Sequence, residues 1–208
     1  MSLQIFDCEQ GSREWFECRM GIPTASEFKT LLSVKKEAKD KITRQTYMRK
    51  LAGEILTGEP MESYSNGYME RGKELEDEAR QAYALIYDAD PQRVGFLRRG
   101  DAGCSPDSLI GEHAGLEIKI ALPHIQIERL EKNELPAEHR AQVQGSIWIT
   151  GRDHWEFVSY CPKLPLLRVC VPRDDGYITT LAGAVDEFNG ELAALVERMR
   201  RYGMKEAA

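Results

Sequence analysis

The segment 115–120, Gly-Leu-Glu-Ile-Lys-Ile, constrains the fold more than any other part of the chain. Its apolar residues alternate with Glu117 and Lys119, and this period of two predicts a half-buried β-strand. Glu117 and Lys119 then project from the same face, about 6.5 Å apart along the strand. Asp107 follows Pro106 in a predicted turn or strand end. From there the chain could bring the Asp107 carboxylate back beside Glu117.

Two carboxylates and a main-chain carbonyl suit magnesium or manganese, because these ions prefer oxygen ligands. A neighbouring lysine can orient a water molecule or stabilise charge that develops during attack on a phosphodiester. An ordinary salt bridge explains the same residues, since Glu and Lys two apart on a strand are common. The Ser-Pro-Asp sequence at 105–107 is also a common turn. These residues alone therefore do not distinguish a metal site from a salt bridge and a turn, and the rest of the chain must decide.

The bulk composition predicts one soluble domain. A chain of 208 residues, 42% hydrophobic and 30% charged, can bury a sizeable core, so residues 1–208 are expected to form a single domain. There is no apolar run long enough to span a membrane, and the N-terminus lacks the features of a signal peptide. We expect a cytoplasmic protein that does not associate with membranes.

Cysteine and histidine spacing predicts neither a zinc site nor a cluster. The cysteines are odd in number and no pair has CxxC spacing, so we expect them to be reduced and mostly buried packing residues. The histidines show no ligand spacing either. Cys104 is expected near the Asp107 site without a role in it. The cysteines are Cys8, Cys18, Cys104, Cys161 and Cys170.

The charge distribution is uneven. The formal net charge is −6, but residues 29–50 hold eight basic and two acidic residues, a local net charge of +6. A basic region on an acidic body is compatible with an electrostatic groove for a polyanion. A solvated helix face explains the run of charge equally well.

Hydrophobic periodicity predicts an α/β sandwich around a mixed sheet. A Thr24–Glu27 capping box is expected to open the second helix. Helices are predicted over residues 12–20, 24–32, 41–57, 64–87, 138–150 and 180–202, and strands over residues 94–98, 107–110, 116–120, 155–160 and 167–171.

Two further segments could contribute to the Asp107 site. Glu76 lies at the border of an apolar helical stripe and could reach inward, although periodicity favours an ion pair with Arg80 or Lys73. Gln142 and Gln144 cannot share a helical face, so one could look into the site while the other is solvated or contacts a neighbour. Surface glutamine is the default interpretation for both.

The N-terminal region offers a phosphate-binding arrangement. Arg19 could give a bidentate contact, and Thr24 and Ser26 lie at a predicted helix start, where N–H groups and hydroxyls attract anions. Plain helix capping with an exposed arginine explains these residues equally well.

Taken together, five ordered blocks resemble the phage lambda exonuclease/YqaJ viral recombinase family within the PD-(D/E)XK nucleases. The resemblance extends from about residue 9 to about residue 160, and it is most specific to lambda-type alkaline exonucleases. The blocks are Glu9-Gln10-Gly11 with Trp15, Arg19-Met20-Gly21 and Thr24-Ala25-Ser26-Glu27; Gly72-Lys73 with Glu76 and Ala79-Arg80; Cys104-Ser105-Pro106-Asp107; Gly115-Leu116-Glu117-Ile118-Lys119; and Ala141-Gln142-Val143-Gln144 with Trp148.

The resemblance implies a restriction-endonuclease-like core, a central mixed β-sheet flanked by helices. It implies a magnesium-dependent exonuclease, with manganese as a substitute, that degrades one strand of duplex DNA from a 5′-phosphorylated end. The expected product is a 3′ overhang for a single-strand annealing recombinase in phage-type recombination. The expected assembly is a ring-shaped homotrimer around DNA, in the cytoplasm of a bacterial host.

The resemblance also implies roles for individual residues. Asp107, Glu117 and the Ile118 carbonyl would bind the metal, with Glu76 in support. Lys119 would position the nucleophilic water, and Gln142 would contact the site. The expected DNA-end residues are Arg19, Ser26 and Thr24 for the 5′-phosphate and Met69 as a wedge; His139 stands where the family has an aromatic residue.

Two other functions remain open from the sequence. A structure-specific or RecB-like endonuclease would use the same core, and efficient cutting of closed circles would identify it. A DNA-end-binding protein without activity would use the fold as a scaffold, but it would have no chemical need for Asp107, Glu117 and Lys119.

Overall fold

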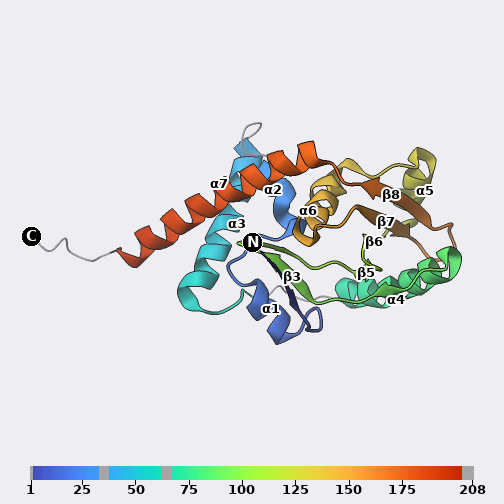
Figure 1. Cartoon of the computed structure of the whole chain (residues 1–208), viewed down its shortest axis with the longest axis horizontal. Helices are drawn as coiled ribbons and strands as arrows, with labels where there is room; N and C mark the ends of the chain where they lie inside the picture. The colour runs from blue at the N-terminus through green and yellow to red at the C-terminus, as the bar shows by residue number, and fades with distance from the viewer. Residues whose placement is uncertain (1, 33–37, 62–66, 203–208) are drawn as a thin grey trace, which may run out of the picture.

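The computed structural model describes residues 2–32, 38–61 and 67–202, with side chains described except at 38–42, 67–71 and 73. Helices and strands alternate irregularly along the chain (Figure 1). The helices are α1 (Arg13–Arg19), η1 (Ala25–Glu27), α2 (Phe28–Leu32), α3 (Ala38–Thr57), α4 (Gly67–Tyr87), α5 (Pro123–Lys132), η3 (Ala137–His139), α6 (Arg140–Thr150) and α7 (Asp175–Arg200). The strands are β1 (Leu3–Phe6), β2 (Pro91–Gln92), β3 (Phe96–Arg99), β4 (Ala102–Cys104), β5 (Ser108–Ile110), β6 (Ala114–Ile120), β7 (His154–Tyr160) and β8 (Leu167–Pro172).

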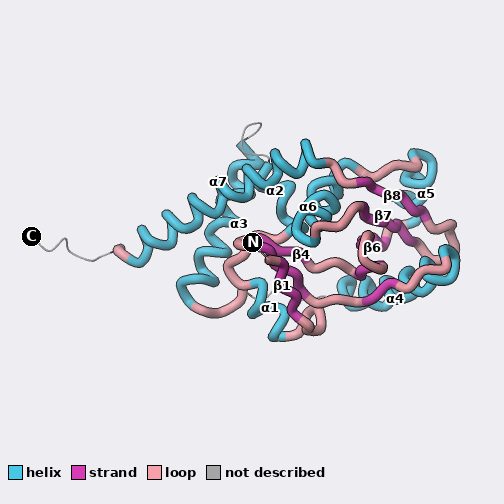
Figure 2. Tube along the Cα trace, viewed as in Figure 1, coloured by secondary structure: helices cyan, strands magenta, loops and turns pink. Residues whose placement is uncertain are grey.

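The strands form two sheets. The larger sheet is mixed, with the order β2-β5-β6-β7-β8, and its only parallel pair among the described strands is β6 with β7. The connection between these two strands contains α5 and α6, as a parallel crossover requires. The smaller sheet is antiparallel, with the order β1-β3-β4. Figure 2 shows the strands lying between helices, as the sequence predicts for an α/β sandwich.

Helices cover both faces of the larger sheet. On one face, Ala79 and Tyr83 of α4 pack against a cluster from β6 and β7 that includes Leu116 and Val158. On the other face, Val143 and Ile147 of α6 pack with other side chains of β7, β8 and α7. These β7, β8 and α7 side chains are Trp155, Phe157, Val171 and Ile178.

A third cluster joins α2, α3, α6 and α7 to the smaller sheet. It contains Phe28 and Leu31 of α2, residues of α3, and a row of α7 side chains that includes Leu181 and Phe188. Helix α7 runs across this layer and extends past it toward the C-terminus (Figure 1). No helix in the described part of the chain combines the length and apolar character needed to cross a membrane.

Most predicted elements are present within a few residues. The final helix begins at Asp175, five residues earlier than predicted, because Asp174 caps it by accepting a hydrogen bond from the Tyr177 amide. The predicted strand 94–98 is observed as β3, and residues 64–66 of the predicted fourth helix lie outside the described residues. The elements that the pattern did not predict are β1, β2, β4 and α5.

Three predictions about local structure are wrong. Thr24 makes no side-chain cap bond, so the expected capping box is absent, and η1 precedes α2 instead. Strand β6 is buried on both faces rather than half-buried, with Glu117 only 2% exposed, because α6 covers the Glu117 side. Only Cys104 and Cys161 of the five cysteines are buried, although all five are free as predicted.

The predicted basic groove is also only partly supported. Arg44 does not face solvent: it is buried and forms a bidentate ion pair with Glu191 of α7, at 2.6 and 3.0 Å. The side chains of residues 35–41 lie outside the described residues. Lys50 is half-buried and lines a pocket, described below.

Candidate active site

The β5–β6 hairpin brings the predicted acidic residues together. Ser108 pairs with Leu116 in this antiparallel ladder, so Asp107 comes opposite Glu117. Asp107 Oδ2 accepts a hydrogen bond from the Ile118 amide at 2.5 Å. Glu117 and Lys119 project from one face of β6, as the alternation predicts, and Lys119 Nζ lies 2.6 Å from Glu117 Oε1. Ile118, whose carbonyl is the predicted third ligand, lies between them.

Gln142 of α6 completes the cluster. Its Nε2 donates to Glu117 Oε1 at 2.6 Å, so this glutamine is not a surface residue. Gln144 points elsewhere: it is buried, donates to the Pro172 carbonyl at 2.8 Å and accepts from the Asp174 amide at 3.0 Å. The prediction that the two glutamines occupy different environments is confirmed, but the default interpretation of both as surface residues is wrong.

Burial and like charge make this cluster unfavourable for two ionised carboxylates. Burial raises the pKa of Asp107 well above its usual range, and the negative charges of Glu117 and Glu76 add to the effect. Burial also raises the pKa of Glu117, although Lys119 opposes that shift. For Lys119, burial lowers the pKa, but its ion pair with Glu117 outweighs burial and raises it overall. Lys119 therefore faces two carboxylates, Asp107 and Glu117, and can neutralise the charge of only one of them.

Free oxygen atoms remain in the cluster. Within the described residues, neither Asp107 Oδ1 nor Glu117 Oε2 has a protein hydrogen-bond partner, while the other oxygen of each carboxylate is engaged. Two free carboxylate oxygens beside an excess of negative charge fit a hard divalent cation. The residues of the cluster therefore fit the magnesium ion that the family resemblance implies.

Glu76 borders the same cluster from α4. It forms the predicted ion pair with Arg80, at 2.5 Å, and its charge also raises the pKa values of Asp107 and Glu117. Arg80 is buried and donates to Ser108 Oγ at 2.9 Å and to the Asp107 carbonyl at 3.3 Å. Arg80 thus ties α4 to the start of β5. In the sequence, Arg80 belongs to a block of the family resemblance, but it was given no role beyond an ion pair with Glu76.

A cavity of about 550 Å³ opens beside Asp107, Glu76 and Arg80. The loop after β1 forms its other wall, and Gln10 of that loop donates to the carbonyls of Pro106, at 2.7 Å, and Val94, at 2.9 Å. Gln10 therefore holds the residue that precedes Asp107. In the sequence, only the Glu9-Gln10-Gly11 block of the family resemblance drew attention to Gln10.

Arg19 of α1 contacts Ser105, two residues before Asp107. Its guanidinium lies 3.8 Å from the centroid of the Trp15 ring and donates to Ser105 Oγ at 2.6 Å. Trp15 Nε1 also donates to Ser105 Oγ, at 3.0 Å. Burial lowers the pKa of Arg19 from its very high usual value. Arg19 is therefore a partly buried cation rather than the exposed arginine of the capping interpretation.

A second pocket, of about 370 Å³, collects the predicted DNA-end residues. Arg19, Thr24 and Ser26 all line it, and the hydroxyls of Thr24 and Ser26 lie 3.2 Å apart. Helix α3 adds Tyr47 and Lys50, which sequence reasoning did not select. The Tyr47 hydroxyl accepts from the Thr24 amide at 3.1 Å, and burial raises the pKa of Tyr47 to about 12.

Two further predicted residues, Met69 and His139, lie outside both pockets as described. Met69 is in α4, and its side chain lies outside the described residues. His139 stacks on Phe157 with ring centroids 5.2 Å apart, and its Nε2 lies 3.2 Å from Arg129 Nη2. Burial and the positive charges of Lys119 and Arg129 lower the pKa of His139 to about 4. His139 is therefore neutral at physiological pH beside the lysine.

Comparisons with known proteins identify the family of this chain. The family model of the YqaJ-like viral recombinase domain matches residues 14–153, which include every predicted site residue. The chain belongs to this family. A comparison with curated protein sequences gave no significant match.

Solved structures of other proteins share the fold. An alkaline exonuclease from Laribacter hongkongensis, LHK-Exo, is 32% identical, with a TM-score of 0.83, over 94% of this chain and 100% of its own. Its complex with dAMP gives 33% identity and a TM-score of 0.84 over the same shares. A phage-related exonuclease from Haemophilus somnus 129PT has 16% identity and a TM-score of 0.64, over 86% of this chain and 96% of its own, which shows likeness of fold alone.

The family relationship confirms the predicted fold class. The five-stranded mixed sheet flanked by helices corresponds to the PD-(D/E)XK-like fold of the alkaline exonucleases. It also supports a nuclease role for this chain.

Proposed function

We propose that this protein is a metal-dependent exonuclease that degrades one strand of linear double-stranded DNA in the 5′→3′ direction. It starts at a 5′-phosphorylated end and leaves a 3′ single-stranded overhang. Residues 1–208 act in this proposal as one nuclease domain. The observation that carries the proposal is the link between two pockets through Ser105-Pro106-Asp107: Ser105 contacts Arg19, while Asp107 belongs to the carboxylate cluster.

The length of this link favours an exonuclease over an endonuclease. Two residues of chain span at most about 7 Å, which is the scale of a single nucleotide. A terminal phosphate at Arg19, Thr24 and Ser26 would therefore leave the next phosphodiester close to Asp107 and Glu117. Release of mononucleotides follows from that spacing. The dAMP complex of LHK-Exo supports a mononucleotide as the product.

The residues of the carboxylate cluster have distinct roles in this proposal. Asp107, Glu117, the Ile118 carbonyl and Glu76 would hold magnesium, or manganese in its place, and the bound ion supplies charge neutralisation and a more acidic water. Lys119 orients the attacking water and stabilises negative charge on the phosphate in the transition state. Gln142 holds the Glu117 carboxylate in place through its 2.6 Å hydrogen bond. Hydrolysis adds the water oxygen to phosphorus and leaves a proton on the departing 3′ oxygen.

The DNA-end pocket offers a terminal phosphate both cations and hydroxyl groups, while Glu27 and Glu54 also line it. Arg19 and Lys50 provide positive charge, and the hydroxyls of Thr24 and Ser26 provide hydrogen bonds for phosphate oxygens. Met69 would separate the strands at the duplex end. Lys50, from the basic region of residues 29–50, would also attract the DNA backbone.

The assembly and partners belong to the same proposal. A homotrimeric ring would place a positive channel inside a negative outer surface, which reconciles DNA binding with a net charge of −6. A single-strand annealing recombinase would receive the overhang. The protein would act in the cytoplasm of a bacterial host, on phage or prophage DNA.

The test is strand-specific degradation of a linear duplex labelled on each strand, in magnesium, with and without a 5′-phosphate. We expect loss of the phosphorylated strand from its 5′ end as mononucleotides, with the complement intact. Closed circular DNA is the control and should survive. Internal cuts, attack on closed circles or equal rates on phosphorylated and unphosphorylated ends would contradict the proposal.

The support that Glu76 gives to the metal site can be measured separately. Glu76→Gln keeps the size of the side chain but removes one negative charge beside Asp107 and Glu117. We expect the magnesium concentration for half-maximal activity to rise about tenfold. Glu131→Gln, which removes one negative charge from an exposed position of α5, is the control and should leave it unchanged. An unchanged magnesium requirement in Glu76→Gln would restrict Glu76 to its ion pair with Arg80.

A further inference from the structure

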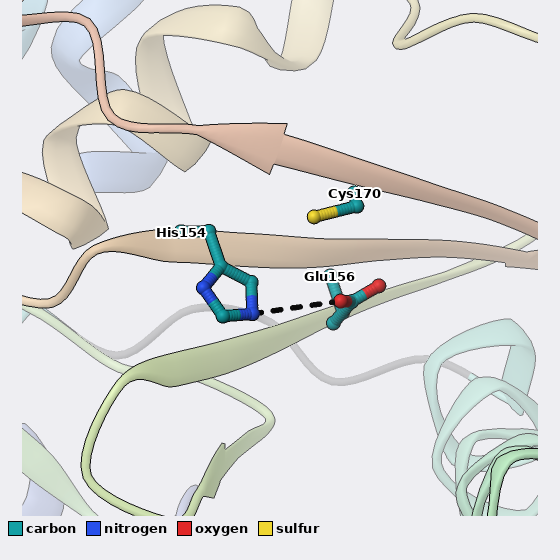
Figure 3. A group of neighbouring side chains, drawn as sticks. All are labelled: His154, Glu156 and Cys170. Carbon is teal, nitrogen blue, oxygen red and sulfur yellow. Dashed lines mark ion pairs between the residues drawn. The ribbon is translucent and has the colours of Figure 1, made fainter.

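Three potential metal ligands converge on the sheet face opposite Glu117 and Lys119. His154 and Glu156 are two residues apart on β7, so their side chains share a face. Cys170 of β8 is the direct partner of Glu156 in the antiparallel ladder, which places it on that face too. Figure 3 shows the three side chains directed toward a common point between the strands.

The distances suit a single ion. One nitrogen of His154, one oxygen of Glu156 and the Cys170 sulfur all lie within 4.8 Å of one another. His154 Nε2 and Glu156 Oε1 are 3.7 Å apart. Bonds of about 2.0–2.3 Å to a tetrahedral ion separate its ligand atoms by roughly 3–4 Å. Small side-chain rotations would therefore complete a coordination site.

The donor set selects the kind of metal. Imidazole, thiolate and carboxylate together are typical of zinc and disfavour magnesium, which prefers oxygen ligands. We propose that His154, Glu156 and Cys170 form a second metal site, for zinc or a similar thiophilic divalent cation, separate from the magnesium site proposed at Asp107 and Glu117.

Arg168 orients the Glu156 carboxylate and leaves it able to bind a metal ion. Its Nε donates to Glu156 Oε2 at 2.6 Å and its Nη2 donates to Oε1 at 2.8 Å, and its guanidinium lies 4.6 Å from the centroid of the Tyr87 ring. A carboxylate oxygen has two lone pairs, so Oε1 can still bind a metal on the side that faces His154. Hydrogen-bonded carboxylates of this kind are normal in metal sites, because the outer partner fixes their orientation.

The site is open to solvent. Strand β8 is an edge of the larger sheet, Cys170 is exposed, and the His154 side chain is 34% exposed, whereas Glu156 is buried. An ion can therefore enter, and a water molecule can take the fourth position. A bound ion would connect β8 to β7, the direct neighbour of the strand that carries Glu117 and Lys119. We expect it to stabilise that edge of the sheet.

Cobalt is the appropriate probe, because its spectrum identifies its ligands. Protein stripped of metal with a chelator is titrated with Co²⁺ under reducing conditions. We expect a thiolate-to-cobalt charge-transfer band in the near ultraviolet, with intense visible bands of tetrahedral coordination, and zinc should displace both. Cys170→Ser should abolish the charge-transfer band, and His154→Ala should lower the cobalt affinity at least about tenfold.

The control distinguishes this site from the proposed active site. Cys8 is a free cysteine that lines the cavity beside Asp107, so Cys8→Ser should retain the band if Cys170 is the ligand. Thermal unfolding of each variant without metal verifies the fold, and added zinc should raise the midpoint of wild type but not of Cys170→Ser. No charge-transfer band in wild type would mean that the cluster is a structural ion pair only, and a band that persists in Cys170→Ser would equally overturn the proposal. Neither readout depends on nuclease activity.

Discussion

Lys119→Ala is expected to lower the rate of nucleotide release from a linear duplex by at least about a hundredfold, the scale of losing one charge that stabilises a transition state. The Lys119 ammonium is the only cation within 4 Å of Glu117 among the described residues. Its removal takes away the proposed water-orienting group and leaves a buried carboxylate without its counter-charge. The measurement is single-turnover release of labelled nucleotides in saturating magnesium.

The fold and the DNA affinity of this variant should be retained. Lys119 contributes no apolar packing to the core clusters, and DNA binding depends in our proposal on other cations. Lys132→Ala is the matched control, because Lys132 also pairs with a glutamate at 2.6 Å but lies exposed on α5. A Lys119→Ala protein that keeps near wild-type rates would exclude Lys119 from the chemistry. Unfolding midpoints and binding without divalent cation separate a catalytic loss from a folding defect.

Arg19→Ala should remove the preference for 5′-phosphorylated ends. A charge-assisted hydrogen bond contributes about 1.5–3 kcal/mol, so we expect the ratio of rates on phosphorylated and unphosphorylated ends to fall by roughly tenfold to a hundredfold. Ser26→Ala should shift the ratio in the same direction by less. The measurement is kcat/KM on two duplexes that differ only in the terminal phosphate.

The ratio is informative even though Arg19 has structural contacts. Loss of packing against Trp15 or of the bond to Ser105 would lower both rates together, whereas loss of phosphate recognition lowers only one. Arg13→Ala provides the control on the same helix, since the Arg13 side chain is 85% exposed and, among the described residues, forms an ion pair only with Glu17. An unchanged ratio in Arg19→Ala would place the terminal phosphate elsewhere.

The local pattern of apolar and polar residues was sufficient to predict the strand and helices that hold the proposed catalytic residues. The alternation at 115–120 correctly predicted that Glu117 and Lys119 share a face of β6, and helical periodicity found α3, α4, α6 and α7 to within a few residues, α7 least closely. Short elements were not predicted, because they contain too few residues to show a hydrophobic periodicity. Strand β4 has three residues, and α5 begins at Pro123 without a side-chain cap.

Burial of polar groups was the least predictable property. Glu117 and Gln144 look like surface residues by type, yet both are 2% exposed because helix α6 packs on that face of the sheet. Arg44 belongs to a basic run in sequence but is paired with a glutamate of α7. Periodicity reports which face of an element is apolar, but not what covers the opposite face.

The sequence by itself determined the family, the β-strand with its carboxylate and lysine, and the candidate residues of both pockets. Only the tertiary structure decided how they combine. Arg19 and Ser105 are 86 residues apart in sequence, and Arg80 and Asp107 are 27 apart, yet each pair is hydrogen-bonded. Strand register alone brings Cys170 beside Glu156. These contacts arise from the packing of whole elements, which no local pattern of residues encodes.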